Sequence, residues 1–157
     1  MFETTSEFSS YRRNLPHWQI GGYTYFVTFR ALRILPNNSR DIVCKKVRDG
    51  HHTTYDLLFG VVMPDHVHLL IRPTKKDTET WHPLPSILQK IKGGTAREIN
   101  IAEHSSGTLW QKESFDRMIR NEHELLEKWE YIWNNPIKAG LVDSIVEYPF
   151  YIRPSVG

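Results

Sequence analysis

Two histidines separated by a single residue, His66 and His68, lie inside an apolar stretch that runs from Leu57 to Ile71. Side chains two positions apart on a β-strand point to the same face, so the two imidazoles would lie side by side. Because neutral imidazole is the commonest metal ligand in proteins, the pair would supply half of a divalent-metal site. The spacing alone leaves open that both are ordinary polar residues of a strand.

A second segment offers the groups that such a site still needs. Tyr131 and Asn135 are four residues apart in a stretch with helical periodicity, which places them on one helix face. The large apolar residues of this stretch fall on another side, so Tyr131 is either functional or merely exposed. The carboxamide oxygen of Asn135 suits Mg²⁺ or Mn²⁺ better than Zn²⁺, although Asn is also common before proline. Together these groups indicate metal-assisted nucleophilic attack on a phosphodiester.

The elements that would position these side chains can be read from the same sequence. β-Branched and aromatic runs bounded by turn signals predict strands at 23–30, 55–63 and 66–72, and we interpret 109–119 as a fourth. Helical patterns occupy 41–47, a stretch beginning at Pro85, and a stretch that opens at Asn121 and ends near Pro136. The order β-α-β-β-α-β matches the ferredoxin-like motif. We therefore expect an α+β fold, an antiparallel sheet with helices on one face.

Composition is ordinary for one globular domain: the 157 residues are 39% hydrophobic and 24% charged. We expect a single domain over 1–157, with 141–157 a C-terminal tail whose aromatic residues dock on the core. The sequence contains no run of 18 apolar residues and does not begin like a signal peptide, so no membrane partner is expected. Cys44 is the only cysteine, which excludes an intrachain disulfide and fits a cytoplasmic location.

The net charge of +2 does not by itself indicate that the protein binds nucleic acid. The distribution of charged residues is more informative than the net charge, because basic residues are concentrated in the first third of the chain. A solvated basic surface is the alternative interpretation of this bias.

Several segments resemble a known family, the single-tyrosine HUH transposases, and most closely its REP-associated tyrosine transposases of bacteria. The two main motifs are 63–70 (MPDHVHLL) and 131–142 (YIxxNPxKAGLV). Further similar segments are 91–100 (IKxxTAxxIN) and 109–120, which begins LWQ and contains DRxIR. The resemblance spans most of residues 11–151, with the motifs in the family's order.

The resemblance implies a ferredoxin-like HUH domain that cuts and rejoins single-stranded DNA. By analogy His66 and His68 are metal ligands, Asn135 takes the place of the third ligand, and Tyr131 is the nucleophile that forms a 5′-phosphotyrosine. The implied cofactor is Mg²⁺ or Mn²⁺, and the implied partner is a DNA hairpin with a single-stranded flank, bound by a monomer or homodimer. Phe115 departs from the family, since many relatives have tyrosine there, and Trp133-Asn134 indicates no particular recognition sequence.

Residues other than the metal ligands and the nucleophile also have candidate roles. Lys128 and Lys138 are candidates to help Tyr131 ionise, and Tyr23 or Tyr25 could stack on unpaired bases. The candidates for DNA-backbone contacts are basic residues spread along the chain: Arg12, Arg13, Arg30, Lys92, Arg97, Arg117 and Arg120. Two other functions fit the same residues: a non-catalytic ferredoxin-like nucleic-acid binder, and a metal-dependent nuclease that uses water and leaves no covalent adduct.

Overall fold

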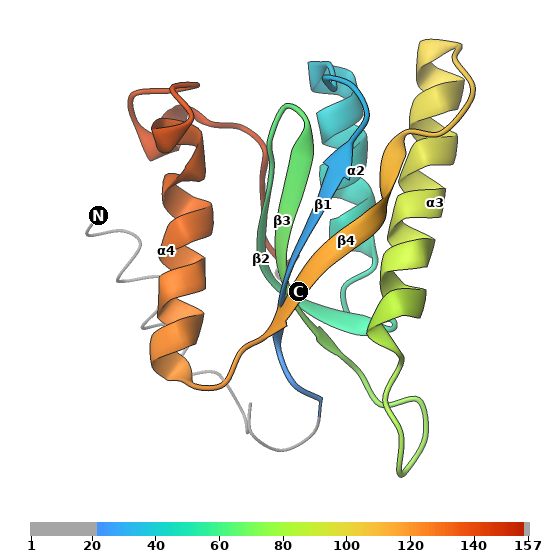
Figure 1. Ribbon diagram of the computed structural model, residues 1–157, viewed down its shortest axis with the longest axis vertical. Coiled ribbons are helices and arrows are strands. Elements are labelled where there is room, and N and C mark those ends of the chain that lie inside the picture. The colour runs from blue at the N-terminus through green and yellow to red at the C-terminus, as the bar shows by residue number, and fades with distance from the viewer. Residues whose placement is uncertain (1–21, 156–157) are drawn as a thin grey trace.

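The computed structural model describes residues 22–155, and a five-stranded antiparallel sheet lies at its centre (Figure 1). The order of the strands across the sheet is β4-β1-β3-β2-β5. The strands are β1 (Tyr25–Ala31), β2 (Tyr55–Val62), β3 (His66–Pro73), β4 (Trp110–Met118) and β5 (Tyr151–Ile152). The helices are α2 (Asn37–Asp49), α3 (Leu84–Glu103), α4 (Glu122–Lys138) and the short 3-10 helix η1 (Ile145–Glu147). The expected α+β class is confirmed.

The predicted β-α-β-β-α-β order is observed from β1 to β4. A tight turn at Pro64-Asp65 joins β2 to β3, and the Met63 N–H donates to the His66 carbonyl across it at 2.7 Å. This hairpin fixes the start of β3 at His66. Pairing between β1 and β3 places Thr28 directly opposite His68, so these two side chains lie on the same face of the sheet.

The two faces of the sheet are covered by different helices (Figure 1). On one face Phe29 packs edge-on against Trp110, whose indole N–H donates to Thr95 of α3. On the other face Phe59 stacks on Trp129 of α4 with ring centroids 4.6 Å apart. The expectation that the helices share one face therefore holds for α2 and α3, while α4 packs on the opposite face. The reason is physical: the face that bears the histidines also bears large apolar side chains, and α4 removes them from water.

Helix α4 begins as predicted and continues past Pro136. The side chain of Asn121 accepts a hydrogen bond from the Glu124 N–H at 2.9 Å, which confirms the N-cap. The helix ends at Lys138, two residues beyond Pro136 and so near the predicted end. Proline costs one helical hydrogen bond, but the next turn closes normally, with the Ala139 N–H donating to the Asn135 carbonyl at 2.9 Å. Asn135 therefore stays within the helix that carries Tyr131.

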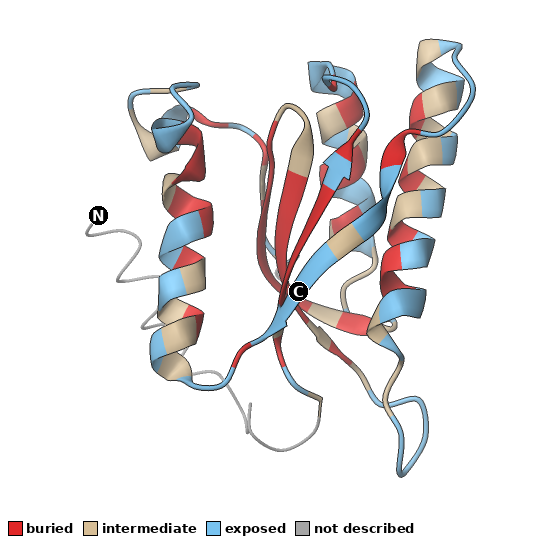
Figure 2. Ribbon diagram, viewed as in Figure 1, coloured by how far each residue is buried: buried red, intermediate tan, exposed pale blue. Residues whose placement is uncertain are grey.

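The C-terminal tail returns to the sheet, as expected, within the described residues. β5 pairs with β2, and Tyr148 and Phe150 are buried. The Tyr151 hydroxyl donates to the Trp133 carbonyl at 2.6 Å and so ties the tail to α4. Burial is concentrated on the central strands and on the inner sides of the helices (Figure 2). None of the helices between residues 22 and 155 is long and apolar enough to cross a membrane.

Candidate active site

Both histidines of the predicted pair lie at the start of β3, and each ring is held through Nδ1. The Asp65 carboxylate lies 2.7 Å from Nδ1 of His66, and the Thr28 hydroxyl lies 2.7 Å from Nδ1 of His68. The two ring centroids are 4.8 Å apart. An imidazole that donates Nδ1–H to an oxygen presents its lone pair on Nε2, which is the arrangement that outer hydrogen bonds impose on metal-binding histidines.

His68 is kept neutral by its surroundings. Its side chain is only 4% exposed, and burial is the largest of the effects that lower the pKa of His68 to about 3. Electrostatic interactions with His66, Arg30 and Lys128 contribute the rest of this lowering. A neutral imidazole is the form that ligates a metal, so the site holds His68 in the required protonation state over the whole neutral range.

Tyr131 reaches this region from α4, the helix that also carries Asn135. The Tyr131 side chain is 43% exposed and meets the His68 ring edge-on, with centroids 5.2 Å apart. Asn135 is buried one turn further along the helix. The structure thus brings the predicted nucleophile beside the predicted histidine pair, although the three residues come from segments more than sixty positions apart in the sequence.

Two buried polar atoms of this region have no hydrogen-bond partner among the described residues: Nε2 of His68 and Oδ1 of Asn135. A buried acceptor without a partner costs about 1–3 kcal/mol, so such atoms in a native fold require an explanation. Both atoms carry lone pairs that a divalent cation accepts. Two imidazoles and a carboxamide oxygen form a donor set that fits a divalent cation, and the choice of Mg²⁺ or Mn²⁺ stays a prediction from the sequence.

Phe26 connects the members of the site, and no sequence pattern indicated this role. Its ring stacks on His68 with centroids 5.4 Å apart and contacts the edge of Tyr131 at 5.8 Å. Nζ of Lys128 lies over the same ring, 5.0 Å from its centroid. Lys128 thus brings a positive charge to the Tyr131 side of the site, whereas Lys138 is exposed in the last turn of α4.

The predicted DNA-contact residues are divided between the two faces of the sheet. Arg30 is exposed and pairs in register with His66, and Arg117 pairs with Phe26, so both belong to the histidine face. Arg117 also forms an ion pair with Glu124 at 2.6 Å. Arg120 is exposed in the loop between β4 and α4. Arg12 and Arg13 lie outside the described residues.

The remaining candidates lie away from the histidine pair. Arg97 is exposed on α3, and Nζ of Lys92 donates to the Gln111 carbonyl at 2.8 Å and so covers the edge strand β4. Lys92 also lines a cavity of about 560 Å³ between α3 and β4, which contains none of the predicted catalytic residues. Tyr23 is exposed, while Tyr25 is half-buried and points to the α3 side.

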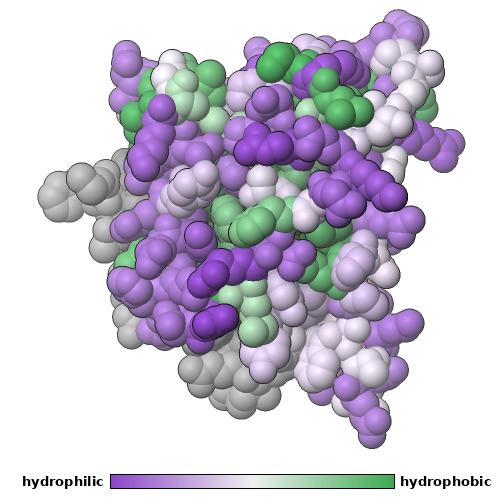
Figure 3. Space-filling model, in the orientation of Figure 1, coloured by the Kyte–Doolittle hydropathy of each residue, from purple (hydrophilic) through white to green (hydrophobic). Residues whose placement is uncertain are grey.

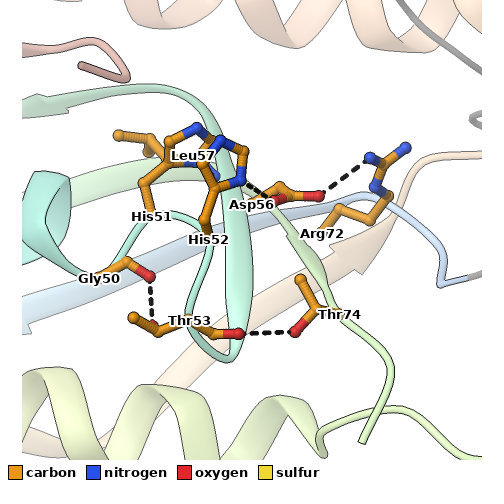
Figure 4. Close-up of polar contacts among 8 residues, drawn as sticks. All are labelled: Gly50, His51, His52, Thr53, Asp56, Leu57, Arg72 and Thr74. Carbon is orange, nitrogen blue, oxygen red and sulfur yellow. Dashed lines mark hydrogen bonds and ion pairs between the residues drawn. The ribbon is translucent and has the colours of Figure 1, made fainter. Parts of the chain in front are cut away.

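A second group of potential ligands, His51, His52 and Asp56, lies at the opposite end of the β2–β3 pair (Figure 4). Several of its polar atoms already form hydrogen bonds. Nδ1 of His51 accepts the Leu57 N–H at 2.8 Å, so the neutral ring carries its proton on Nε2. Nδ1 of His52 lies 2.8 Å from the Asp56 carboxylate, which also accepts from Arg72 at 3.1 Å. These contacts form a hydrogen-bonded network between the loop at 50–53 and strands β2 and β3, and the ligand atoms of the three residues lie within 4.8 Å of one another.

Comparison with curated proteins gives two relatives whose sequences align with nearly the whole chain. A Haemophilus influenzae protein named "Putative REP-associated tyrosine transposase" is 20% identical over 147 residues, which are 90% of this chain and 84% of that protein. The REP-associated tyrosine transposase of Escherichia coli K12 is 23% identical over 146 residues, which are 90% and 81% of the two chains. This chain is similar to the REP-associated tyrosine transposases. The resemblance predicted from the two motifs is confirmed.

Structural comparison finds a protein of the same fold. A solved REP-associated tyrosine transposase, bound to a REP hairpin, superposes with a TM-score of 0.63 at 24% identity over 84% of this chain and 77% of that one. The likeness shows that the fold is shared with the REP-associated transposase. Comparison with models of protein families finds no match.

Proposed function

We propose that this chain is a metal-dependent tyrosine transposase that nicks and rejoins single-stranded DNA next to a hairpin. One observation carries the proposal: an exposed tyrosine, Tyr131, lies against His68, whose Nε2 is buried without a partner, and the same helix carries Asn135 with a buried, unpartnered Oδ1. The relatives support it, since they bear the name of this activity and the solved one holds a DNA hairpin.

His66, His68 and Asn135 would hold the divalent cation, Mg²⁺ or Mn²⁺. When bound, the cation supplies a Lewis acid for a non-bridging oxygen of the scissile phosphate. Thr28 and Asp65 fix the orientation of the two histidine rings. Asn135 lies one turn after Tyr131 on α4, so the same helix positions both residues.

Tyr131 supplies the nucleophile. Its hydroxyl oxygen attacks phosphorus and forms a 5′-phosphotyrosine ester, while the bond from phosphorus to the 3′ oxygen breaks. The phenol loses its proton, and the departing 3′ oxygen gains one to become a free 3′-OH. Because the ester conserves the energy of the phosphodiester, a 3′-OH can attack it in the reverse direction and join strands without ATP. The exposed position of Tyr131 leaves its hydroxyl accessible to a DNA strand.

The charges around the site favour a phosphate. Arg30 and Lys128 both act electrostatically on His68, from β1 and from α4 respectively. A scissile phosphate held between them would be neutralised from two sides. The buried, reduced Cys44 suits the cytoplasm, which we propose as the location of this reaction.

The test is incubation of the full chain with a labelled hairpin oligonucleotide that carries a single-stranded flank, with Mn²⁺ or with EDTA, followed by denaturing electrophoresis. We expect a labelled covalent protein–DNA adduct with Mn²⁺ and none with EDTA. Cleaved DNA without an adduct would indicate a nuclease that uses water. Binding with neither product would indicate a non-catalytic DNA-binding protein, and either result would overturn the proposal.

A further inference from the structure

Only three of the large aromatic side chains between residues 22 and 155 are exposed: Tyr23, Phe115 and Tyr131. Phe115 is the sole phenylalanine among them and is 57% exposed. We propose that Phe115 is a stacking platform for an unpaired nucleobase that flanks the scissile phosphate. This inference rests on the proposed function, because it places the base relative to Tyr131 and the histidine pair.

The register of the sheet places Phe115 in line with the site. Phe115 of β4 pairs with Thr28 of β1, and Thr28 pairs with His68 of β3. Directly paired residues of antiparallel strands share a face, so this row crosses three strands on the face that bears the histidines. Adjacent strands are about 4.8 Å apart, which puts Phe115 about 10 Å from His68. That separation suits a nucleotide near the scissile phosphate.

This part of the face is open to solvent. Helix α4 covers β2 and β3, where Phe59 and His68 lie beneath Trp129 and Tyr131. Beyond β1 the strand β4 forms the edge of the sheet, and most of its residues are exposed (Figure 2). Hydrophilic side chains dominate the side of the molecule on which β4 lies in front, with hydrophobic patches between them (Figure 3).

Cations flank the exposed ring on the same face. Arg117, which is ion-paired with Glu124, lies two positions along β4, and Arg30 lies on the neighbouring strand β1. An aromatic ring beside positive charges is the combination that binds single strands, because bases stack on the ring while the backbone follows the charges. A base within a duplex already stacks on its neighbours, so only unpaired nucleotides offer a free surface to Phe115.

The experiment measures binding without turnover. The full chain with Tyr131→Phe is combined with Phe115→Ala, Phe115→Leu or Phe115→Tyr, and each protein is titrated with hairpins whose flank carries 2-aminopurine at successive positions. We expect Phe115→Ala to weaken binding of the flanked hairpin by about 5- to 150-fold, and binding of a blunt duplex hardly at all. Phe115→Leu keeps an apolar side chain without a π-face and should resemble Phe115→Ala. Phe115→Tyr should retain affinity.

The fluorescence of 2-aminopurine is quenched by stacking, so it reports the contact directly. We expect strong quenching at one or two flank positions, lost with Phe115→Ala and kept with Phe115→Tyr. Equal affinity and equal quenching for Phe115→Ala, or no binding of the flanked hairpin by any variant, would overturn the inference. A change in sedimentation with unaltered DNA binding would instead assign Phe115 to contact between copies of the chain, which also overturns it.

The proposed function is tested by formation of the covalent adduct, whereas the stacking site is tested by DNA affinity and 2-aminopurine quenching. If the protein with Tyr131 intact forms no covalent adduct but the quenching pattern depends on Phe115 as expected, the stacking site stands and the transposase mechanism does not. If the adduct forms and Phe115→Ala binds flanked DNA normally, the mechanism stands and the stacking site does not.

Discussion

The hydroxyl of Thr28 lies 2.7 Å from Nδ1 of His68 and links β1 to β3 at the centre of the sheet. The contact joins residues that are 40 positions apart in the sequence. It holds the imidazole in one orientation, with Nε2 left for another partner. Since the orientation of a ligand determines how well it meets a metal, Thr28 belongs to the proposed metal site although it offers no ligand itself.

Thr28→Val should therefore weaken Mn²⁺ binding by about 10- to 100-fold, because valine keeps the shape of threonine and removes only the hydrogen bond. Thr28→Ser keeps the hydroxyl and should bind Mn²⁺ nearly as well as the natural chain. Electron paramagnetic resonance of free Mn²⁺ measures both affinities without any DNA. Equal affinities for the valine and serine variants would show that the Thr28 contact does not orient the ligand.

His68→Ala should abolish adduct formation while hairpin affinity changes by no more than about 1 kcal/mol, since phosphate contacts supply most of the binding. His52→Ala is the matched control, because His52 lies in the network at the other end of β2 and β3. That variant should form the adduct normally. Gel-shift and adduct assays on the same preparations separate the two effects. Parallel loss of binding and cleavage in His68→Ala would mark His68 as structural.

Local sequence patterns predicted where the proposed site residues lie better than they predicted the contacts around them. Helical periodicity excluded Tyr131 from the apolar stripe of α4, and Tyr131 is indeed exposed while Trp129 and Trp133 are each only 4% exposed. Alternation along β3 placed His66 and His68 on one face. These predictions succeeded because each depends only on the local geometry of one element.

Features that depend on how elements meet were not predicted. The role of Thr28 follows from the β1–β3 register, which no local pattern specifies. The continuation of α4 past Pro136 also depends on packing, because a proline is an unfavourable helix residue in isolation but Pro136 lies in a buried turn. The position of α4 on the histidine face likewise follows from tertiary packing against Phe59.

Trp129→Ala should lower the free energy of unfolding by about 3–5 kcal/mol, the usual range for removing a buried aromatic ring. The indole stacks on Phe59, and the deletion would leave a cavity between α4 and the sheet. Urea denaturation followed by circular dichroism provides the measurement. Glu130→Ala, at an exposed position of the same helix, is the control and should change stability by less than about 0.5 kcal/mol. A loss below about 1 kcal/mol for Trp129→Ala would contradict the packing of α4 described above.

Cys44 should make stability depend on pH in the alkaline range. Burial raises the pKa of the Cys44 thiol from 9.0 to about 12. The unfolded chain therefore releases this proton at lower pH than the folded chain, and ionisation stabilises the unfolded state. The contribution is fully present below pH 9 and is lost as the pH rises from 9 to about 12, at up to about 1.4 kcal/mol per pH unit.

The measurement is the free energy of unfolding at several pH values for the natural chain and for Cys44→Ala, under reducing conditions. The difference between the two proteins should change with pH above 9 and stay constant below it. The folded thiol should also resist iodoacetamide at pH 8, since the reactive species is the thiolate. Rapid alkylation of the folded protein at that pH would contradict the assigned burial.

Tyr131→Phe tests the mechanism most directly, because it removes one oxygen and leaves the ring. The edge contacts with His68 and Phe26 involve the ring alone, so the fold and the metal affinity should be retained. The covalent adduct and strand joining should disappear together, since both require the phosphotyrosine ester. Mn²⁺ affinity and thermal unfolding of the variant serve as controls for the site and the fold. A nuclease that activates water would continue to nick the hairpin in this variant, and vigorous cleavage by Tyr131→Phe would therefore exclude Tyr131 as the nucleophile.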